Sequence, residues 1–403
     1  MNSKPRKPLL NKSHRLILAI TLSLTILVAI YCAFVLVIKE YSFNLPEQKQ
    51  TVQGEPLIIK FSEYGNAGVK VAGQQEAFVK SDASLPTAST IKLLTVLIIL
   101  DKLGESNLKQ KQFTVTNKDM AITNGYIANN GSIVPIEVGQ TISYYDALSY
   151  ILVRSANNVT DIMVAEVFGT KEEFVKYAND FMPKNNIRQT VVTDPTGFAP
   201  ATVSTATDLL RVAEMAVSNP TVTTITKQNN IILPNGTTAS STNLFLPISY
   251  GQLIGLKTGF TSEAGSVFIA GVALPNKDIV TSVVMGADSP SQSQSESLVL
   301  AQQIASTYKT RTVVRDNATV FSVPLPWGDA AELYTKAKVE VPIYGYQSIT
   351  FQTKGVVVSE NTPANEAVID MNITSPKTTV TTPLYIRNLH SPSTVWKLMH
   401  PLW

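Results

Sequence analysis

Cysteine and histidine are nearly absent from this chain. Its 403 residues include one cysteine, Cys32, which lies in an apolar run, so we predict no disulfide, no thiolate zinc site and no exposed cysteine nucleophile. The three histidines, His14, His390 and His400, all lie near the ends of the chain, so residues 15–389 contain no imidazole. A hydrolase built on this chain must therefore use another base, and we expect no metal and no cofactor.

A surplus of one charge sign is also missing. The first 15 residues hold five of the 33 basic residues and no acid, which leaves 28 basic against 30 acidic residues. Nucleic-acid binding needs a basic face, so we predict no nucleic-acid partner. Apolar residues make up 44% of the chain and charged residues 16%, a composition that can bury one large core and a smaller second one.

One long hydrophobic run is present near the N-terminus. Residues 16–38 carry no charge and are long enough to cross a hydrocarbon core of ~30 Å at ~1.5 Å per residue. Because the five bases precede this run, we predict a single-pass membrane helix with residues 1–15 in the cytoplasm and the chain from residue 39 outside. A cleaved signal peptide and a buried helix are the alternatives; the length of the run favours the span.

The rest of the chain divides by pattern into four segments. Residues 39–55 look like a polar stalk, and residues 56–314 mix helix and strand patterns, with an almost wholly apolar helix over 91–103 and a strand hairpin over 267–285. Residues 315–392 contain β-branched runs broken by glycine and proline, which predicts a small all-β domain. Residues 393–403 form a short apolar tail that either packs on this β domain or touches a bilayer.

Three short segments supply candidate catalytic groups. In Ser89-Thr90-Ile91-Lys92, at the start of a predicted helix, positions i and i+3 share a face, so the Ser89 hydroxyl and the Lys92 amine can approach each other. An amine accepts a serine proton only when it is neutral, and the apolar run 93–100 would desolvate it. The other two segments are Ser155-Ala156-Asn157 and Lys257-Thr258-Gly259. Each alone is a weak signal, and their order and settings carry the argument.

This set resembles the penicillin-recognising serine enzymes, and within them the low-molecular-mass serine D-alanyl-D-alanine carboxypeptidases. The likeness covers about residues 57–312 and includes Asp194-Pro195-Thr196-Gly197-Phe198, while Trp327-Gly328-Asp329 and the strands after it resemble the second domain of many members. The resemblance implies an α+β fold of the β-lactamase/DD-peptidase type, with an antiparallel sheet between helix layers, followed by a small all-β domain.

The resemblance also implies catalytic roles. Ser89 would be the acylated nucleophile, Lys92 its general base, and Ser155 the relay of a proton to the leaving D-alanine. The backbone amides of Ser89 and Phe260 would form the oxyanion hole. Deacylation by water would complete a hydrolysis.

Four further residues would bind the substrate, a peptidoglycan stem peptide ending in D-Ala-D-Ala. Asn157 would orient Lys92 and the substrate amide, Lys257 and Thr258 would hold the terminal carboxylate, and Gly259 would let the substrate strand lie against the backbone. β-Lactams would be covalent inhibitors at the same site.

The chain departs from the family pattern at two places. It has Asn158 where many relatives have aspartate, and it has no arginine between Asn235 and Leu256, where some members use one near the substrate carboxylate.

Several other functions remain alternatives. DD-endopeptidase or transpeptidase activity is the nearest, followed by an inactive membrane-anchored binding protein and by a β-lactamase. Class A β-lactamases need a glutamate between the second and third segments. The corresponding loop, residues 191–202, contains Asp194 and no glutamate, and Glu166 falls in a predicted apolar helix.

Overall fold

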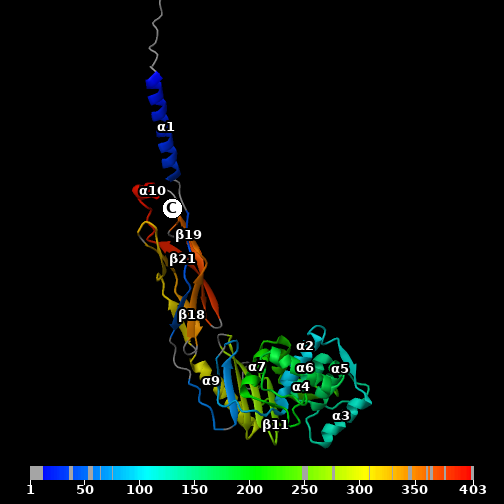
Figure 1. Ribbon diagram of the computed structural model, residues 1–403. Helices are drawn as coiled ribbons and strands as arrows, with labels where there is room; N and C mark the ends of the chain where they lie inside the picture. Colours follow the sequence, from blue (N-terminus) through cyan, green and yellow to red (C-terminus); the bar gives the residue numbers. More distant parts are fainter. Residues whose placement is uncertain are drawn as a thin grey trace, which may run out of the picture. The chain divides into compact units, whose positions relative to one another are not determined.

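The computed structural model describes residues 12–35, 40–52, 58–63, 65–74, 76–246, 253–274, 277–307, 309–328, 330–343, 347–359, 362–363, 366–375 and 378–400. These residues form two compact units. One unit holds the described residues between 58 and 309, and the other combines the N-terminal residues up to 52 with those from 310 onward. The first unit is called the catalytic unit below and the second the β unit (Figure 1).

A five-stranded antiparallel sheet organises the catalytic unit. Its strands lie in the order β11 (Lys257–Thr261), β12 (Gly265–Ala273), β13 (Ile279–Ala287), β3 (Asn66–Val71) and β4 (Ala77–Val79). The predicted hairpin is confirmed, with Val272 opposite Val280. Neighbouring residues on β13 enter different cores, Val283 on one face and Val284 on the other, because side chains alternate along a strand.

Helices cover both faces of this sheet (Figure 1). Helix α9 (Pro290–Thr307) packs on β12 and β13 through Leu300 and Ile304, which join the smaller core with Val69 and Val284. Helix α7 (Ala206–Val217) packs on β3, β12 and β13 and belongs to the larger core. The predicted α+β class with a sheet between helix layers is therefore confirmed.

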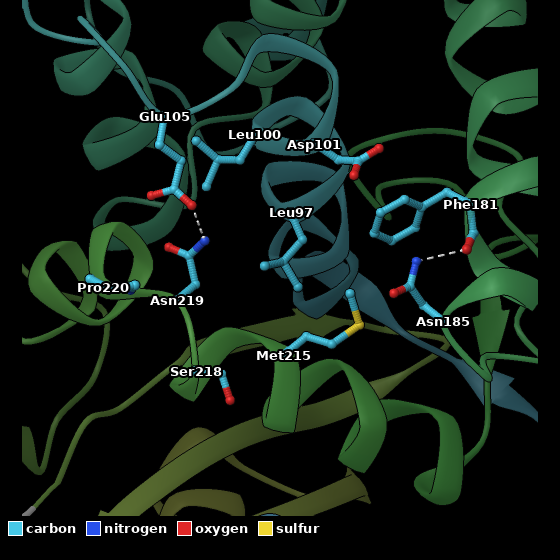
Figure 2. A pocket seen from close by; sticks show the side chains of 10 residues that line it. All are labelled: Leu97, Leu100, Asp101, Glu105, Phe181, Asn185, Met215, Ser218, Asn219 and Pro220. Atoms are coloured by element: carbon cyan, nitrogen blue, oxygen red, sulfur yellow. Dashed lines mark hydrogen bonds between the residues drawn. The ribbon is translucent and has the colours of Figure 1, made fainter.

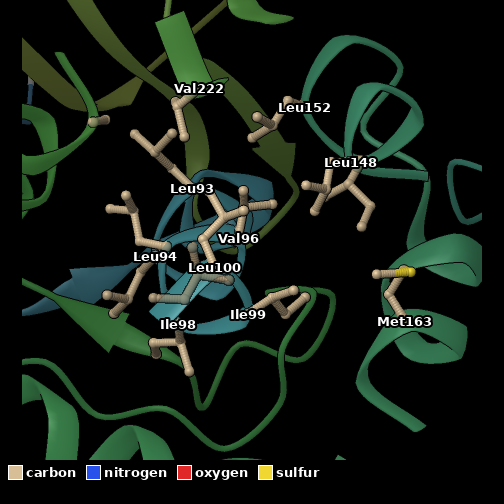
Figure 3. Close-up of a cluster of buried hydrophobic side chains, with 14 of the residues drawn as sticks. Leu93, Leu94, Val96, Ile98, Ile99, Leu100, Leu148, Leu152, Met163 and Val222 are labelled. Atoms are coloured by element: carbon tan, nitrogen blue, oxygen red, sulfur yellow. The ribbon is translucent and has the colours of Figure 1, made fainter. Parts of the chain in front are cut away.

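Helix α2 (Ile91–Leu103) is the centre of the larger core. Every residue from Ile91 to Leu100 is buried, as its apolar sequence predicts, and the helix ends at Gly104, whose φ is 69°. Figure 3 shows its side chains beside Leu148, Leu152, Met163 and Val222. The helices α4 (Tyr144–Val153), α5 (Asn157–Phe168) and α6 (Lys171–Lys184) pack on it. Helix α3 (Asn117–Ala128) packs on α5, and α8 (Pro220–Thr226) packs on α4.

Three short strand pairs connect these helices. Each is antiparallel: β5 (Leu85–Pro86) with β8 (Val203–Ser204), β6 (Gln112–Thr114) with β7 (Thr141–Ser143), and β9 (Asn230–Ile232) with β10 (Thr238–Ser240). The first pair lies directly before the turn that carries Ser89, so it fixes the entry of the chain into α2.

The β unit contains a six-stranded sheet and two strand pairs. The sheet order is β15 (Thr319–Pro324), β16 (Ala330–Tyr334), β21 (Thr379–Arg387), β20 (Ala367–Thr374), β18 (Gln347–Thr353) and β2 (Gln48–Val52). The pairs are β1 (Glu40–Phe43) with β19 (Val356–Ser359) and β14 (Lys309–Val314) with β17 (Val339–Ile343). Inward side chains such as Phe321, Leu333 and Met371 form a separate core.

The expected stalk and domain boundary need correction. Residues 40–43 and 48–52 are strands β1 and β2 of the β unit instead of a stalk, and β2 is the edge strand of the larger sheet, with side chains that are mostly exposed. An edge strand of this kind carries no alternating apolar pattern, so its sequence resembles a polar linker. The β unit also begins before residue 315, because Lys309–Val314 forms β14.

A helix lies near each end of the chain. Helix α1 (Lys12–Val35) contains an apolar window, Leu16–Ala33, long and apolar enough to cross a membrane, whereas residues 36–38 of the predicted span lie outside the described residues. In the C-terminal tail, α10 (Thr394–Met399) places Trp396 edge-on to Trp327 of the β unit, with ring centroids 5.8 Å apart. Val395 and Met399 are exposed. The Leu398 carbonyl also accepts a hydrogen bond from the Tyr31 hydroxyl of α1 at 2.8 Å, so the tail contacts this unit at more than one point.

The central position of α2 gives a stability prediction. Leu93→Ala should destabilise the catalytic unit by about 3 kcal/mol, because the Leu93 side chain is fully buried and its truncation leaves a cavity in the core. For a unit of this size, we expect the melting temperature of the detergent-solubilised chain to fall by about 6–12 °C. Ile127→Ala, which truncates an exposed side chain on α3, is the control and should cost at most about 0.5 kcal/mol. Equal shifts for both variants would contradict the assignment of α2 as the core.

Candidate active site

Ser89 and Lys92 lie next to each other at the start of α2. Ser89 belongs to a short 3₁₀ turn, Ala88–Thr90, that leads directly into the helix, so its backbone amide is at the positive end of the helix dipole. The Lys92 side chain is completely buried, and its Nζ lies within hydrogen-bond distance, 2.7 Å, of Ser89 Oγ. Nζ also donates to the carbonyl of Thr196 at 2.7 Å. The i, i+3 spacing therefore brings hydroxyl and amine together.

Burial makes the Lys92 amine a usable base. Desolvation lowers the pKa of Lys92 from 10.5 to about 7, although the carboxylates of Asp194 and Asp161 favour its charged form. A lysine with this pKa is neutral in a large fraction of molecules near neutral pH, and a neutral amine can take a proton from a serine hydroxyl.

The loop that contacts Lys92 is held by an aspartate. Asp194 Oδ1 accepts hydrogen bonds from the backbone amides of Thr196, at 2.8 Å, and Gly197, at 2.9 Å, and Oδ2 accepts from the Thr202 hydroxyl at 3.1 Å. These bonds fix the direction of the Thr196 carbonyl, which accepts from Lys92. The Asp194 carboxylate is therefore a structural element of the loop. Sequence reasoning missed this role, although Asp-Pro-Thr-Gly is typical of an Asx turn.

Gly197 lets the loop approach the turn that carries Ser89. Its φ is +68°, a conformation that favours glycine, and a Cβ added there would lie 1.9 Å from the carbonyl oxygen of Ala88. No side chain fits at this position without moving the backbone on either side of the site.

Ser155 lies on the turn between α4 and α5, and Asn157 is the first residue of α5. Ser155 has a φ of +60° and is 5% exposed, and the backbone amide of Asn157 donates to the Ser132 carbonyl at 2.7 Å. The side-chain oxygen of Asn157 is buried and has no hydrogen-bond partner within the described part of the chain. A buried acceptor of this kind is available to a donor from a ligand. Neither side chain is hydrogen-bonded to Ser89 or Lys92 in the described residues.

Asn158 shows how the chain accommodates its departure from the family pattern. Its Oδ1 accepts from the Val134 amide at 3.1 Å, while its Nδ2 donates to the Val134 carbonyl at 2.8 Å and to the Thr123 hydroxyl at 3.2 Å. An ionised aspartate has no proton to donate to that carbonyl. The Asn158 side-chain amide therefore holds residues 132–134 in place. The Ser132 carbonyl of this segment accepts the hydrogen bond from the Asn157 backbone amide.

Lys257 supplies a second buried amine near Lys92. It is 1% exposed, and its Nζ donates to the Thr258 carbonyl at 2.8 Å. Burial lowers the pKa of Lys257 well below its usual value, and the nearby Lys92 lowers it further. Desolvation and the charge of Lys92 thus both disfavour the charged form of Lys257.

Strand β11 lies directly against the turn that carries Ser89. A Cβ added at Gly259 would be 2.9 Å from the Ser89 amide nitrogen and 3.0 Å from that of Thr90, which explains why the third motif segment ends in glycine. The next residue, Phe260, has a side chain that is 58% exposed. Thr258 makes its side-chain contact elsewhere, with the hydroxyl of Thr242 at 2.6 Å.

A separate hollow of about 370 Å³ lies along the C-terminal half of α2 (Figure 2). None of the predicted site residues lines it. Its two carboxylates already accept hydrogen bonds, Glu105 from Asn219 at 2.6 Å and Asp101 from Tyr177 at 2.7 Å. The candidate active site is therefore at the other end of the helix.

Comparison with known proteins agrees with the motif arrangement. Residues 70–289, more than half of the chain and including all three motif segments, match the family model described as D-alanyl-D-alanine carboxypeptidase. The chain belongs to this family. The expected family is therefore confirmed.

Two curated relatives illustrate the range within the family. The D-alanyl-D-alanine carboxypeptidase DacF of Bacillus subtilis is 26% identical over 253 residues, which are 62% of this chain and 63% of that protein. A D-alanyl-D-alanine endopeptidase of Pseudomonas aeruginosa is 29% identical over 212 residues, 51% of this chain and 65% of that protein. In both cases the match spans just under two thirds of the relative.

Solved structures share the fold over most of the chain. Penicillin binding protein 5 from Haemophilus influenzae has a TM-score of 0.58 and 18% identity, covering 83% of this chain and 98% of that one. A peptidoglycan synthesis regulatory factor from Streptococcus pneumoniae has a TM-score of 0.61 and 20% identity, covering 80% and 98%. At these identities the comparison establishes the fold alone.

The close approach at Gly197 gives a prediction for the site's framework. Gly197→Ala should lower the stability of the catalytic unit by about 3 kcal/mol, because the new Cβ would collide with the Ala88 carbonyl at a left-handed φ. Gly236→Ala is a matched control: Gly236 also has a positive φ, +81°, but nothing lies within 4 Å of its Cβ position. We expect a loss of about 1 kcal/mol there. An equal loss of stability for both variants in thermal denaturation would contradict the close contact between residue 197 and the Ala88 carbonyl.

Proposed function

We propose that this protein is a serine DD-carboxypeptidase that removes the terminal D-alanine from peptidoglycan stem peptides through an acyl-enzyme on Ser89. The observation that carries the proposal is the fully buried Lys92 amine, 2.7 Å from the Ser89 hydroxyl. Membership of the D-alanyl-D-alanine carboxypeptidase family and the name of the Bacillus subtilis relative support the same activity.

Acylation begins with a proton transfer. Neutral Lys92 takes the proton of Ser89, whose Oγ attacks the carbonyl carbon of the penultimate D-alanine. The developing negative charge on the carbonyl oxygen is stabilised by the backbone amides of Ser89 and Phe260. Ser155 passes the proton to the leaving amine, and D-alanine departs as the peptide bond breaks.

Substrate binding uses the remaining predicted residues. The partnerless Asn157 oxygen accepts a substrate amide proton, and the Lys257 and Thr258 side chains hold the terminal carboxylate. Gly259 gives the peptide close access to β11. A water then attacks the acyl-enzyme, Lys92 takes its proton, and the ester between Ser89 and the shortened peptide is hydrolysed.

We also propose a membrane location. The apolar window of α1 is compatible with a membrane anchor, and the five bases before it support an orientation with the first 15 residues in the cytoplasm and both folded units on the outer side, where peptidoglycan lies. β-Lactams, which would acylate Ser89 in place of the peptide, are the expected covalent inhibitors.

DD-endopeptidase activity is the second candidate, favoured by the relative of that name in Pseudomonas aeruginosa. A β-lactamase is disfavoured because the loop at residues 191–202 has no glutamate, and the Asp194 carboxylate accepts four hydrogen bonds from the backbone and hydroxyl groups of its own loop. An Asp194 carboxylate held in this way is not free to activate a deacylating water. Glu166 lies outside this loop, on α5, with an exposed side chain.

The activity is tested directly by D-alanine release. The detergent-solubilised full chain, incubated with a peptide ending in D-Ala-D-Ala, should release one D-alanine per peptide, and Ser89→Ala should release none, because it lacks the nucleophile. Mass spectrometry of the peptide distinguishes loss of one residue from cleavage of a cross-linked dimer. Cleavage of the dimer alone would replace the proposal with an endopeptidase, and no cleavage of either substrate would overturn both.

The pH dependence should follow the ionisation of Lys92. Because burial lowers the pKa of Lys92 to about 7, D-alanine release should fall about tenfold per pH unit below that value, where the amine is protonated, and level off above it. Lys92→Arg should release no D-alanine at any pH, because a guanidinium does not deprotonate in this range. A rate that is constant from pH 5.5 to 8.5, or an active arginine variant, would remove Lys92 as the base.

A further inference from the structure

The Thr258 hydroxyl has a neighbour that the motif segments do not include. Thr242 Oγ1 lies 2.6 Å from Thr258 Oγ1, and either oxygen can donate in this contact. Both side chains are half-buried, so they are partly accessible from solvent. Thr242 and Thr258 are 16 positions apart in the sequence, so the fold brings their hydroxyls together.

Thr242 is held in place by the segment that leads into Ser155. Its backbone amide donates to the carbonyl of Val153, the last residue of α4, at 3.2 Å. Two residues earlier, the carbonyl of Ser240 accepts a hydrogen bond from the guanidinium of Arg154. Thr242 therefore links the end of α4, two residues before Ser155, to Thr258 of the third motif segment, and its backbone amide helps to hold it in place.

The hydrogen-bond geometry sets the direction of the protons. A threonine hydroxyl has one proton to donate and two lone pairs that accept. The other acceptor near Thr242 Oγ1 is the Val153 carbonyl at 3.5 Å, which is long for a hydroxyl donor, whereas Thr258 Oγ1 is at 2.6 Å. When an anion lies beside Thr258, the Thr242 proton is best placed on Thr258 Oγ1, and the Thr258 proton then points to the anion. Chained hydroxyls polarise each other and strengthen the outer bond.

We propose that Thr242 is a positioning residue of the carboxylate subsite, where it donates to Thr258 Oγ1 and so directs the Thr258 proton to the terminal carboxylate of the substrate. The inference rests on the proposed function and adds a residue to it. Residues 235–256 contain no arginine, so no guanidinium of this segment recognises the carboxylate. The hydroxyl pair and the Lys257 amine carry the recognition instead.

The test compares two peptides that differ only in the charge of the last group. One ends in D-Ala-D-Ala with a free carboxylate, and the other ends in D-Ala-D-alaninamide, which has the same scissile bond and no carboxylate. Thr242→Val keeps the shape and removes the hydroxyl, so kcat/KM for the acid should fall about tenfold, mainly through KM, while kcat/KM for the amide stays unchanged.

Two further variants complete this experiment. Thr242→Ser keeps the hydroxyl and should retain the acid-to-amide ratio of the unmodified protein. Thr238→Val makes the same substitution on an exposed position of β10 and should change neither substrate. If the valine variant does not fold, as judged by its melting temperature, Thr242→Ala takes its place with the same expected loss.

The outcomes separate this inference from the function on which it rests. If the unmodified protein does not cleave the acid peptide, the proposed function fails and the role of Thr242 fails with it. If it does cleave that peptide but the loss in Thr242→Val is equal for acid and amide, Thr242 supports only the local structure. If Thr242→Val cleaves both peptides as fast as the unmodified protein, the inference is also overturned. In both of these cases the proposed function stands.

Discussion

The burial of one amine is the constraint on which the rest of the catalytic unit depends. Lys92 can be a base only if it is removed from water, and its removal from water needs α2 to be apolar on all sides and to lie at the centre of the core. The same burial requires a polar partner for Nζ, which the Thr196 carbonyl supplies. Asp194 and Gly197 then follow as the residues that let this carbonyl reach the amine.

A second consequence is the order of the elements around α2. The turn that carries Ser89 must remain open to a substrate, so the strand beside it, β11, contacts it through a glycine. Lys257 on this strand is fully buried, and the nearby Lys92 adds to the desolvation that lowers the pKa of Lys257. Thr242 connects β11 to the end of α4, because it contacts both Thr258 and the Val153 carbonyl. Residues outside the three motif segments therefore help to hold these segments together.

Much of the fold was predictable because its patterns are local. The almost wholly apolar segment 91–100 predicts a buried helix, and the hairpin of β12 and β13 has strong strand patterns on both sides of its turn. Strands β1 and β2 were missed because an edge strand with exposed polar side chains looks like a linker. In the site, the pairing of Ser89 with Lys92 follows from helical spacing. The roles of Thr242 and Asp194 depend on tertiary contacts, which a single sequence does not contain.

The proposed mechanism requires Lys92 to be neutral in a large fraction of molecules at neutral pH. Its most direct test is an NMR titration of the full chain with isotope-labelled lysine side chains, in which Lys92→Arg identifies the Lys92 signal by its loss. This signal should titrate at a pKa of about 7, because the side chain is fully buried. A titration near the usual lysine value of about 10.4 would contradict it.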